Sequence, residues 1–166
     1  SQEETGLKNP GSSFHLLFPY RQQVSQVVLP ASKNRRYRLL VVDDEPAIRR
    51  FVDILLSKDY DLELAASGAE GLEQARIFNP DLVLLDLFMP KMDGCEVCQK
   101  LKEDPQTKNI PVVILTAMSR KYERARGHEV GAVDYITKPF LPRELTQRIE
   151  QLLAQHCASK KALLED

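Results

Sequence analysis

The chain has 166 residues, of which 43% are hydrophobic and 28% are charged, and its formal net charge at pH 7 is −1. This length suits one domain with a remainder, and the balanced charge gives no electrostatic footprint for direct binding of nucleic acid. No apolar run reaches the ~18 residues that a membrane span requires, and no basic leader followed by an apolar stretch marks the chain for export.

The three cysteines are an odd number, which argues against a disulfide framework and fits a reducing cytoplasm. We therefore expect a cytoplasmic protein without membrane contact. Cys95 and Cys98 form one C-x-x-C pair, but the second ligand pair that a structural zinc site needs is missing. Because Val97 and Leu101 lie at helical spacing around them, we expect both thiols to lie on a helix.

Residues 1–34 differ from the rest of the chain, because glycine, proline and serine interrupt a stretch whose apolar residues have no helical or strand period. Residues 24–29 favour one short strand at most. Two interpretations stay open: a mobile tail, or a segment that docks on the domain or on a partner. We divide the chain into an N-terminal extension (1–34), one domain (35–158) and a C-terminal tail (159–166).

From Arg38 onward, short apolar runs alternate with segments of helical period. The expected strands are 39–42, 61–65, 82–85, 111–116 and 134–137. The expected helices begin near residues 46, 68, 94, 121 and 142. Parallel strands need crossover connections, and these are right-handed. The pattern therefore predicts an α/β, flavodoxin-like, doubly wound parallel sheet of order 2-1-3-4-5 with five flanking helices.

Individual residues predict where the helices begin and which side chains they bury. Ser67, with Glu70 three residues later, is typical of a capping box, and the helix that begins there is expected to bury Leu72, Ala75 and Ile77. The last helix is expected to fray after about residue 158. Its apolar stripe contains Leu145, Ile149, Leu152 and Leu153.

Several strands deliver reactive side chains at their carboxyl ends, where open α/β sheets bind their ligands. These residues are Asp43, Asp44, Asp86, Thr116 and Lys138. Taken alone, Asp86 would be equally consistent with a residue that caps the turn after its strand. The first and third strands flank the switch point, however, so we expect their carboxylates to converge.

Three converging carboxylates repel one another and raise one another's pKa, and a divalent cation resolves this repulsion. Oxygen ligands with room for several waters suit Mg²⁺. Lys138 and Thr116 supply a point cation and a hydroxyl donor, which is what the oxygens of a phosphoryl group need. Each residue alone is weak evidence, but five on successive strand ends favour phosphoryl chemistry.

At these positions the sequence resembles the receiver domain of bacterial two-component response regulators over residues 37–155. The segments that carry the resemblance are 41–45 (VVDDE), 84–90 (LLDLFMP) with 93–94 (DG), 111–117 (PVVILTA) and 134–140 (DYITKPF). The resemblance implies that Asp86 accepts a phosphoryl group from a sensor histidine kinase or a phosphotransfer protein. It implies that the chain is not an enzyme beyond its own phosphorylation and slow autodephosphorylation.

The resemblance also implies roles for the neighbouring residues. Mg²⁺ would be held by Asp44, by Asp86 and by the backbone carbonyl of Phe88, with Asp43 acting through water. Thr116 would hydrogen-bond the phosphoryl group.

Three further roles are implied by the same resemblance. Lys138 would pair with the phosphoryl group, and its bond to Pro139 would be a cis peptide. Tyr135 would be the switch residue that turns inward when Thr116 moves.

The segment 138–145 is most similar to the receivers of winged-helix transcription factors, which implies transcription as an output. That similarity implies a homodimer with cross-subunit ion pairs. Arg124 with Glu144, and Asp134 with Arg148, match two of the expected pairs, whereas a third is not matched. The output would lie in a further domain, unless the chain is a stand-alone receiver.

Two alternative functions fit the sequence less well. A phosphatase of the haloacid dehalogenase type needs a second aspartate two residues after the nucleophile, and Phe88 stands there. A phosphorylation-independent pseudo-receiver would act as a protein-interaction module. The five site residues that are present disfavour the pseudo-receiver.

Overall fold

The computed structural model describes residues 35–117 and 130–164. In these residues, five parallel strands form one sheet of order β2-β1-β3-β4-β5. The strands are β1 (Arg38–Val42), β2 (Asp61–Ala65), β3 (Leu82–Asp86), β4 (Val112–Thr116) and β5 (Asp134–Thr137). This is the flavodoxin-like topology that the sequence predicts.

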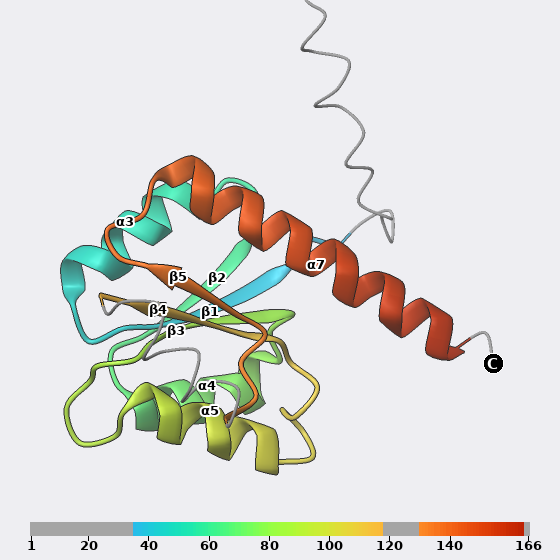
Figure 1. Cartoon of the computed structure of the whole chain (residues 1–166), viewed down its shortest axis with the longest axis horizontal. Helices are drawn as coiled ribbons and strands as arrows, with labels where there is room; N and C mark the ends of the chain where they lie inside the picture. The colour runs from blue at the N-terminus through green and yellow to red at the C-terminus, as the bar shows by residue number, and fades with distance from the viewer. Residues whose placement is uncertain (1–34, 118–129, 165–166) are drawn as a thin grey trace, which may run out of the picture. The chain divides into compact units, whose positions relative to one another are not determined.

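The described helices are α3 (Pro46–Leu56), α4 (Gly68–Phe78), α5 (Gly94–Glu103) and α7 (Pro142–Leu164). Figure 1 shows α3 and α7 on one face of the sheet and α4 and α5 on the other. The expected helix over 121–130 lies outside the described residues, apart from its last residue.

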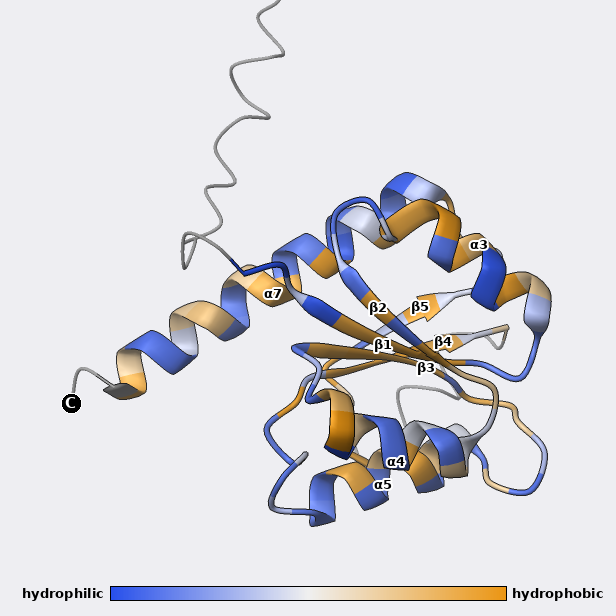
Figure 2. Ribbon diagram, turned by 180° about the vertical axis from the view of Figure 1, so that it is seen from behind, coloured by the Kyte–Doolittle hydropathy of each residue, from blue (hydrophilic) through white to orange (hydrophobic). Residues whose placement is uncertain are grey.

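The sheet is the centre of two hydrophobic layers, because successive side chains of a strand point to opposite faces. In β1, Leu39 and Val41 belong to the layer under α3 and α7, whereas Leu40 and Val42 belong to the layer over α4 and α5. All residues of β3 and β4 are buried. Figure 2 shows these central strands as continuous hydrophobic ribbons. Both faces of the sheet are therefore covered, as parallel sheets require.

Short polar contacts fix where the helices begin. Pro46 lies in the first turn of α3, where its missing N–H costs nothing. Ser67 Oγ accepts a hydrogen bond from the backbone N of Glu70 at 3.2 Å, while Glu70 Oε2 accepts one from the backbone N of Ala66 at 2.8 Å. The predicted capping pattern is present, with the return bond one residue earlier than in the usual box.

The prediction that Ile77 is buried is wrong, because its side chain is 70% exposed. The buried face of α4 consists instead of Gly68, Gly71 and Ala75, with Leu72 partly buried. A Cβ at Gly71 would lie 2.7 Å from Val42 Cγ2. The helix therefore packs closely on the sheet through its smallest residues, which turns the larger Ile77 outward.

Helix α7 is longer than predicted, since it continues to Leu164 rather than fraying after Ala158. Its predicted stripe is confirmed: Leu145, Ile149 and Leu153 are buried, and Leu152 packs against the same layer. Residues 158–163 are exposed, and they include Ala, Lys and Leu, which have high helix propensity. Across the described helices, none combines the length and apolarity needed to cross a membrane.

The predicted placement of two cysteines on a helix is confirmed. Cys95 and Cys98 are buried on α5, and neither forms a disulfide. The Sγ of Cys98 donates to the backbone O of Val130 at 3.3 Å. Cys157 is also free, and its Sγ lies 3.2 Å from the hydroxyl of Tyr37.

Candidate functional site at the carboxyl edge of the sheet

Three carboxylates meet at the carboxyl ends of β1 and β3. The register pairs Val42 with Leu85, so Asp43 and Asp86, the next residue of each strand, lie side by side. One carboxylate oxygen from each of Asp43, Asp44 and Asp86 lies within 4.8 Å of the others. The strand order thus brings Asp86 beside Asp43 and Asp44, although more than 40 positions separate Asp86 from either of them in the sequence.

Asp43 is fully buried, and its polar atoms are held from several directions. Its Oδ1 accepts a hydrogen bond from the backbone N of Glu45 at 2.9 Å, and its Oδ2 accepts one from Lys138 Nζ at 2.7 Å. Its carbonyl oxygen accepts a hydrogen bond from Arg49 Nη1 at 2.6 Å. These contacts fix the orientation of the carboxylate, because each rotation would break a charge-assisted hydrogen bond.

Lys138 reaches the acidic cluster from the end of β5. Its backbone N donates to the carbonyl of Thr116 at 2.7 Å, and a cis peptide bond joins it to Pro139. Its Nζ lies 3.4 Å from Asp86 Oδ1. Burial alone would lower the pKa of Lys138, but its hydrogen bond to Asp43 and the charges of Asp86 and Asp43 outweigh burial and raise the pKa. The ammonium group therefore stays charged beside the carboxylates.

Asp86 is only 6% exposed. Burial and the negative charge of Asp43 raise the pKa of Asp86 to about 6, while the charge and hydrogen bond of Lys138 and the backbone N–H of Phe88 act in the opposite direction. A second cation at this edge would favour the ionised form further. The donors are all hard oxygen atoms on two adjacent strand ends, which is a set that fits Mg²⁺.

The remaining predicted site residues surround this cluster. Thr116 ends β4 and is fully buried. Phe88 lies two residues after Asp86, and its side chain is 48% exposed. Tyr135 pairs with Ile114 in the β4–β5 register and packs against the cluster that contains Ile114, Leu87 and Cys95.

Two residues near the site were not predicted to contact it. Arg49 binds the carbonyl of Asp43. Gly94 begins α5, and a Cβ there would collide with the backbone oxygen of Asp86 and lie 2.8 Å from Leu87 Cα. The Asp93-Gly94 pair is part of a sequence motif, but only the structure shows that the glycine makes room for the strand end.

The structure describes three of the four residues that were predicted to form ion pairs across a dimer. Arg148 Nε lies 3.4 Å from Asp134 Oδ2 within the same chain, so this pair needs no partner subunit to form. Glu144 is exposed on the first turn of α7. Arg124 lies outside the described residues.

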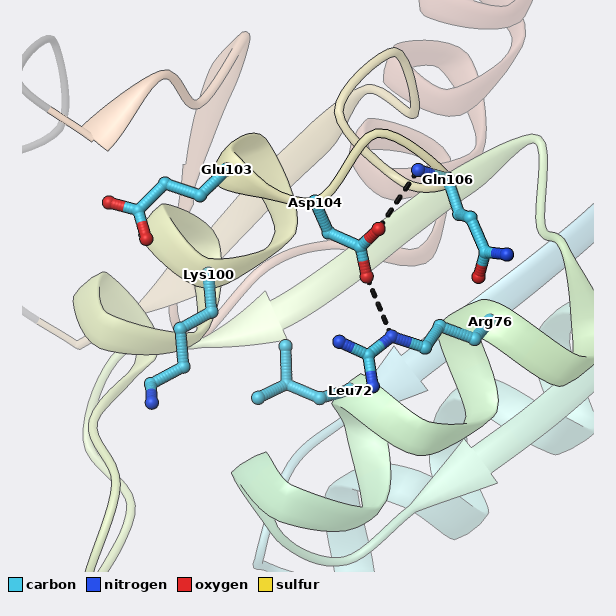
Figure 3. Close-up of a pocket in the computed structure, with 6 residues that line it drawn as sticks. All are labelled: Leu72, Arg76, Lys100, Glu103, Asp104 and Gln106. Atoms are coloured by element: carbon cyan, nitrogen blue, oxygen red, sulfur yellow. Dashed lines mark hydrogen bonds and ion pairs between the residues drawn. The ribbon is translucent and has the colours of Figure 1, made fainter.

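A separate hollow lies between α4 and α5 and is shown in Figure 3. Its lining residues are Leu72, Arg76, Lys100, Glu103, Asp104 and Gln106. The Nε of Arg76 lies 2.6 Å from Asp104 Oδ2. Asp104 comes directly after the last residue of α5, about 15 Å along the helix from Gly94 at ~1.5 Å per residue, so the hollow is remote from the acidic cluster.

This fold, with an acidic cluster at the carboxyl edge of its sheet, is that of a known family. The family model of the response regulator receiver domain matches residues 39–150, and the chain belongs to this family. Among curated proteins, the chain is 44% identical over 117 residues to the DNA-binding dual master transcriptional regulator RpaA of Synechocystis sp., covering 70% of this chain and 48% of RpaA. It is 41% identical over 117 residues to the alkaline phosphatase synthesis transcriptional regulatory protein PhoP of Bacillus subtilis, with the same coverage of 70% and 48%. The chain thus spans about half the length of these relatives.

Solved structures give the same result. A response regulator receiver domain protein (CheY-like) from Methanospirillum hungatei is similar with a TM-score of 0.70 and 28% identity, over 75% of this chain and 99% of that chain. The chemotaxis protein CheY4 of Vibrio cholerae is similar with a TM-score of 0.68 and 31% identity, over 70% and 98%.

Proposed function

We propose that the chain is a phosphorylation-dependent switch in which Asp86 accepts a phosphoryl group from a phosphohistidine of a sensor histidine kinase or a phosphotransfer protein. The observation that carries this proposal is the convergence of Asp43, Asp44 and Asp86 with Lys138 at one strand edge. An ionised carboxylate is already a nucleophile and needs no general base. The output is proposed to be transcriptional, since RpaA and PhoP are named as transcriptional regulators.

In the transfer step, an oxygen of Asp86 forms the new bond to phosphorus while the P–N bond of the donor breaks and its electron pair stays on the imidazole nitrogen. Lys138 is proposed to pair with a phosphoryl oxygen, which is supported by its contacts with Asp43 and Asp86. The hydroxyl of Thr116 is proposed to donate a second hydrogen bond. The side chains thus position and neutralise the transferring group, which is what phosphoryl transfer requires.

The same cluster is proposed to hold Mg²⁺. Asp44, Asp86 and the backbone carbonyl of Phe88 would be direct ligands, with Asp43 acting through water. A bound Mg²⁺ would supply positive charge to the phosphoryl oxygens in the transition state.

The proposal makes the chain a switch rather than an enzyme with an external substrate, and places it in the cytoplasm with a kinase as its partner. Tyr135 is proposed to report the movement of Thr116. Dimerisation through Arg124, Asp134, Glu144 and Arg148 is retained as a proposal. The pair between Asp134 and Arg148 within one chain would have to be shared or exchanged in such a dimer.

The proposal is tested by incubating the chain with acetyl phosphate and Mg²⁺ and measuring its intact mass. One added phosphoryl group is expected in the wild type and none in Asp86→Asn. Asp44→Ala is expected to react poorly, because it lacks a metal ligand, while Asp104→Asn, a matched change at the remote hollow, is expected to react like the wild type. Undiminished labelling of Asp86→Asn would refute the assignment, and an unlabelled wild type would favour the pseudo-receiver.

A further inference from the structure

Arg49 connects α3 back to the strand that precedes it. It is the fourth residue of the helix, and its backbone N donates to the carbonyl of Glu45 at 3.2 Å. Its side chain reaches two residues further back along the chain and donates from Nη1 to the carbonyl of Asp43 at 2.6 Å. The residue therefore spans the loop 43–45, which follows β1 and contains Asp43 and Asp44 of the acidic cluster.

The carbonyl of Asp43 depends on this contact. The backbone N of Asp43 is bound to the carbonyl of Ala65 at 3.1 Å, and both carboxylate oxygens are bound by Glu45 N and Lys138 Nζ. The carbonyl lies beyond the last residue of β1, and Asp43 is fully buried. A buried carbonyl without a donor is costly, so removing the Arg49 guanidinium favours rotation of the peptide between Asp43 and Asp44.

Arg49 is also placed against the local preference of its helix. A positive charge near a helix N-terminus is unfavourable because the exposed backbone N–H groups already carry positive charge there. The first turn of α3 contains no acidic residue that would offset it. A residue that breaks a local rule beside a functional site indicates a role at that site.

We propose that Arg49 is a positioning residue for the metal-binding loop: it fixes the carbonyl of Asp43 and thereby the direction in which Asp44 leaves the strand. This inference rests on the proposed function, because it concerns the same acidic cluster. The positioning role predicts the direction in which the Mg²⁺ affinity changes when Arg49 is removed. Removing a nearby positive charge strengthens cation binding by simple electrostatics, whereas loss of positioning weakens it.

The test compares Arg49→Ala, Arg49→Lys and the control Arg50→Ala in the full chain. Arg50 is the next residue of α3, is exposed, and carries the same charge. Mg²⁺ affinity is measured by isothermal titration calorimetry without any phosphodonor. Arg49→Ala is expected to weaken Mg²⁺ binding about tenfold, and Arg49→Lys, which keeps one donor and the charge, is expected to recover to within about threefold of the wild type. Arg50→Ala is expected to match the wild type or bind slightly tighter.

Tighter Mg²⁺ binding by Arg49→Ala, or equal changes in Arg49→Ala and Arg50→Ala, would overturn the proposal, because Arg49 would then act only as a charge. Circular dichroism and thermal unfolding identify any variant that fails to fold. If Arg49→Ala does not fold, the Mg²⁺ affinity of Arg49→Lys tests the positioning role instead. Arg49→Lys should bind Mg²⁺ within about threefold of the wild type, and a tenfold loss in this folded variant would overturn the proposal.

A second measurement separates this inference from the proposed function. The exchange rate of the Glu45 amide, whose N–H is bound to Asp43 Oδ1, is measured by NMR in metal-free protein. Arg49→Ala is expected to speed this exchange at least fivefold, while Arg50→Ala leaves it unchanged. A wild type that binds no Mg²⁺ would refute the proposed function, and the amide measurement would still decide the role of Arg49. Unchanged exchange in Arg49→Ala would overturn the positioning role.

Discussion

Lys138 and Asp43 form the shortest ion pair at the acidic edge, with 2.7 Å between Nζ and Oδ2, although 95 positions separate them in the sequence. The aspartate is fully buried, and the lysine side chain is only 14% exposed. A buried pair of this kind is costly to break by removing one partner, because the other charge remains without compensation. The pair therefore links the stability of the fold to the chemistry of the site.

Replacing Lys138 with Met is expected to lower the free energy of unfolding by about 2–3 kcal/mol, since Asp43 and Asp86 then repel each other without a cation between them. Mg²⁺ is expected to restore more stability in this variant than in the wild type. Urea denaturation with and without Mg²⁺ measures both effects. The control is Lys100→Met, whose exposed pair with Glu96 spans 3.7 Å and is worth at most about 0.5 kcal/mol. Equal stability of Lys138→Met and the wild type would contradict this role.

Thr116→Ala is expected to accept a phosphoryl group but to transmit the signal poorly, because the hydroxyl at the end of β4 is proposed to bind the phosphoryl oxygen. The measurement is hydrogen exchange over residues 117–130, most of which lie outside the described chain, before and after acetyl phosphate. The wild type should change in this segment, and Thr116→Ala should change less. Thr107→Ala is the control, since Thr107 is equally buried but binds the carbonyl of Leu101. A wild-type segment that stays unchanged while exchange elsewhere shifts would mean that the switch lies elsewhere.

The phosphorylated state is expected to decay slowly, because Phe88 is bulky, stands beside Asp86 and cannot orient a water by hydrogen bonding. Met118, which lies outside the described residues, is expected to act in the same way. Phe88→Asn combined with Met118→Glu should speed the decay by one to two orders of magnitude, or roughly 1.4 kcal/mol of barrier per factor of ten. The time course after removal of phosphodonor gives the rate. The control is Ile77→Asn, a change at an exposed apolar residue on α4. Equal decay rates in the wild type, the double variant and the control would mean that groups other than Phe88 and Met118 determine the access of water.

Gly94→Ala is expected to destabilise the protein by about 1–3 kcal/mol through overpacking and also to slow phosphorylation, because the added Cβ meets the backbone of Asp86 and Leu87. Gly71→Ala is the matched comparison. Its Cβ meets the side chain of Val42, which can shift without moving Asp86. Thermal unfolding and acetyl phosphate labelling should separate the two variants. Normal labelling of folded Gly94→Ala would show that the strand end tolerates the displacement.

The thiols are expected to react in a fixed order. Burial raises the pKa of Cys98 to about 11, with the charge of Lys102 opposing this and that of Cys95 adding to it. Only the thiolate is nucleophilic, so iodoacetamide at pH 8 should leave Cys98 unmodified in the folded protein. The partly exposed Cys157 should react first. Modification at Cys98 should rise as the pH approaches about 11, and mass spectrometry of tryptic peptides measures it. Early modification of Cys98 at pH 8 would indicate that α5 opens readily.

The sheet order and the residues at its carboxyl edge were predictable because hydrophobic period and strand ends are local features of the sequence. The exposure of Ile77 was not predictable, because a helix that packs through Gly68 and Gly71 turns a different face inward from the one with the largest side chains. The contact of Arg49 with the main-chain carbonyl of Asp43 could not be predicted, because every residue has such a carbonyl and the residue type does not mark it. The length of α7 was underestimated because exposed residues with high helix propensity resemble a tail in composition.

The contact between Tyr37 and Cys157 has a consequence for how a signal leaves the domain. Tyr37 directly precedes β1 and Cys157 lies late in α7, so the first described residues and the distal half of α7 share the amino end of the sheet. Asp86 lies at the other end of five-residue strands, about 17 Å away at ~3.3 Å per residue. Anything tethered at either of these positions is separated from Asp86 by the depth of the sheet. Such a module would not touch the acidic cluster, so exchanging it for another module is expected to leave the contacts of Asp43 and Lys138 unchanged.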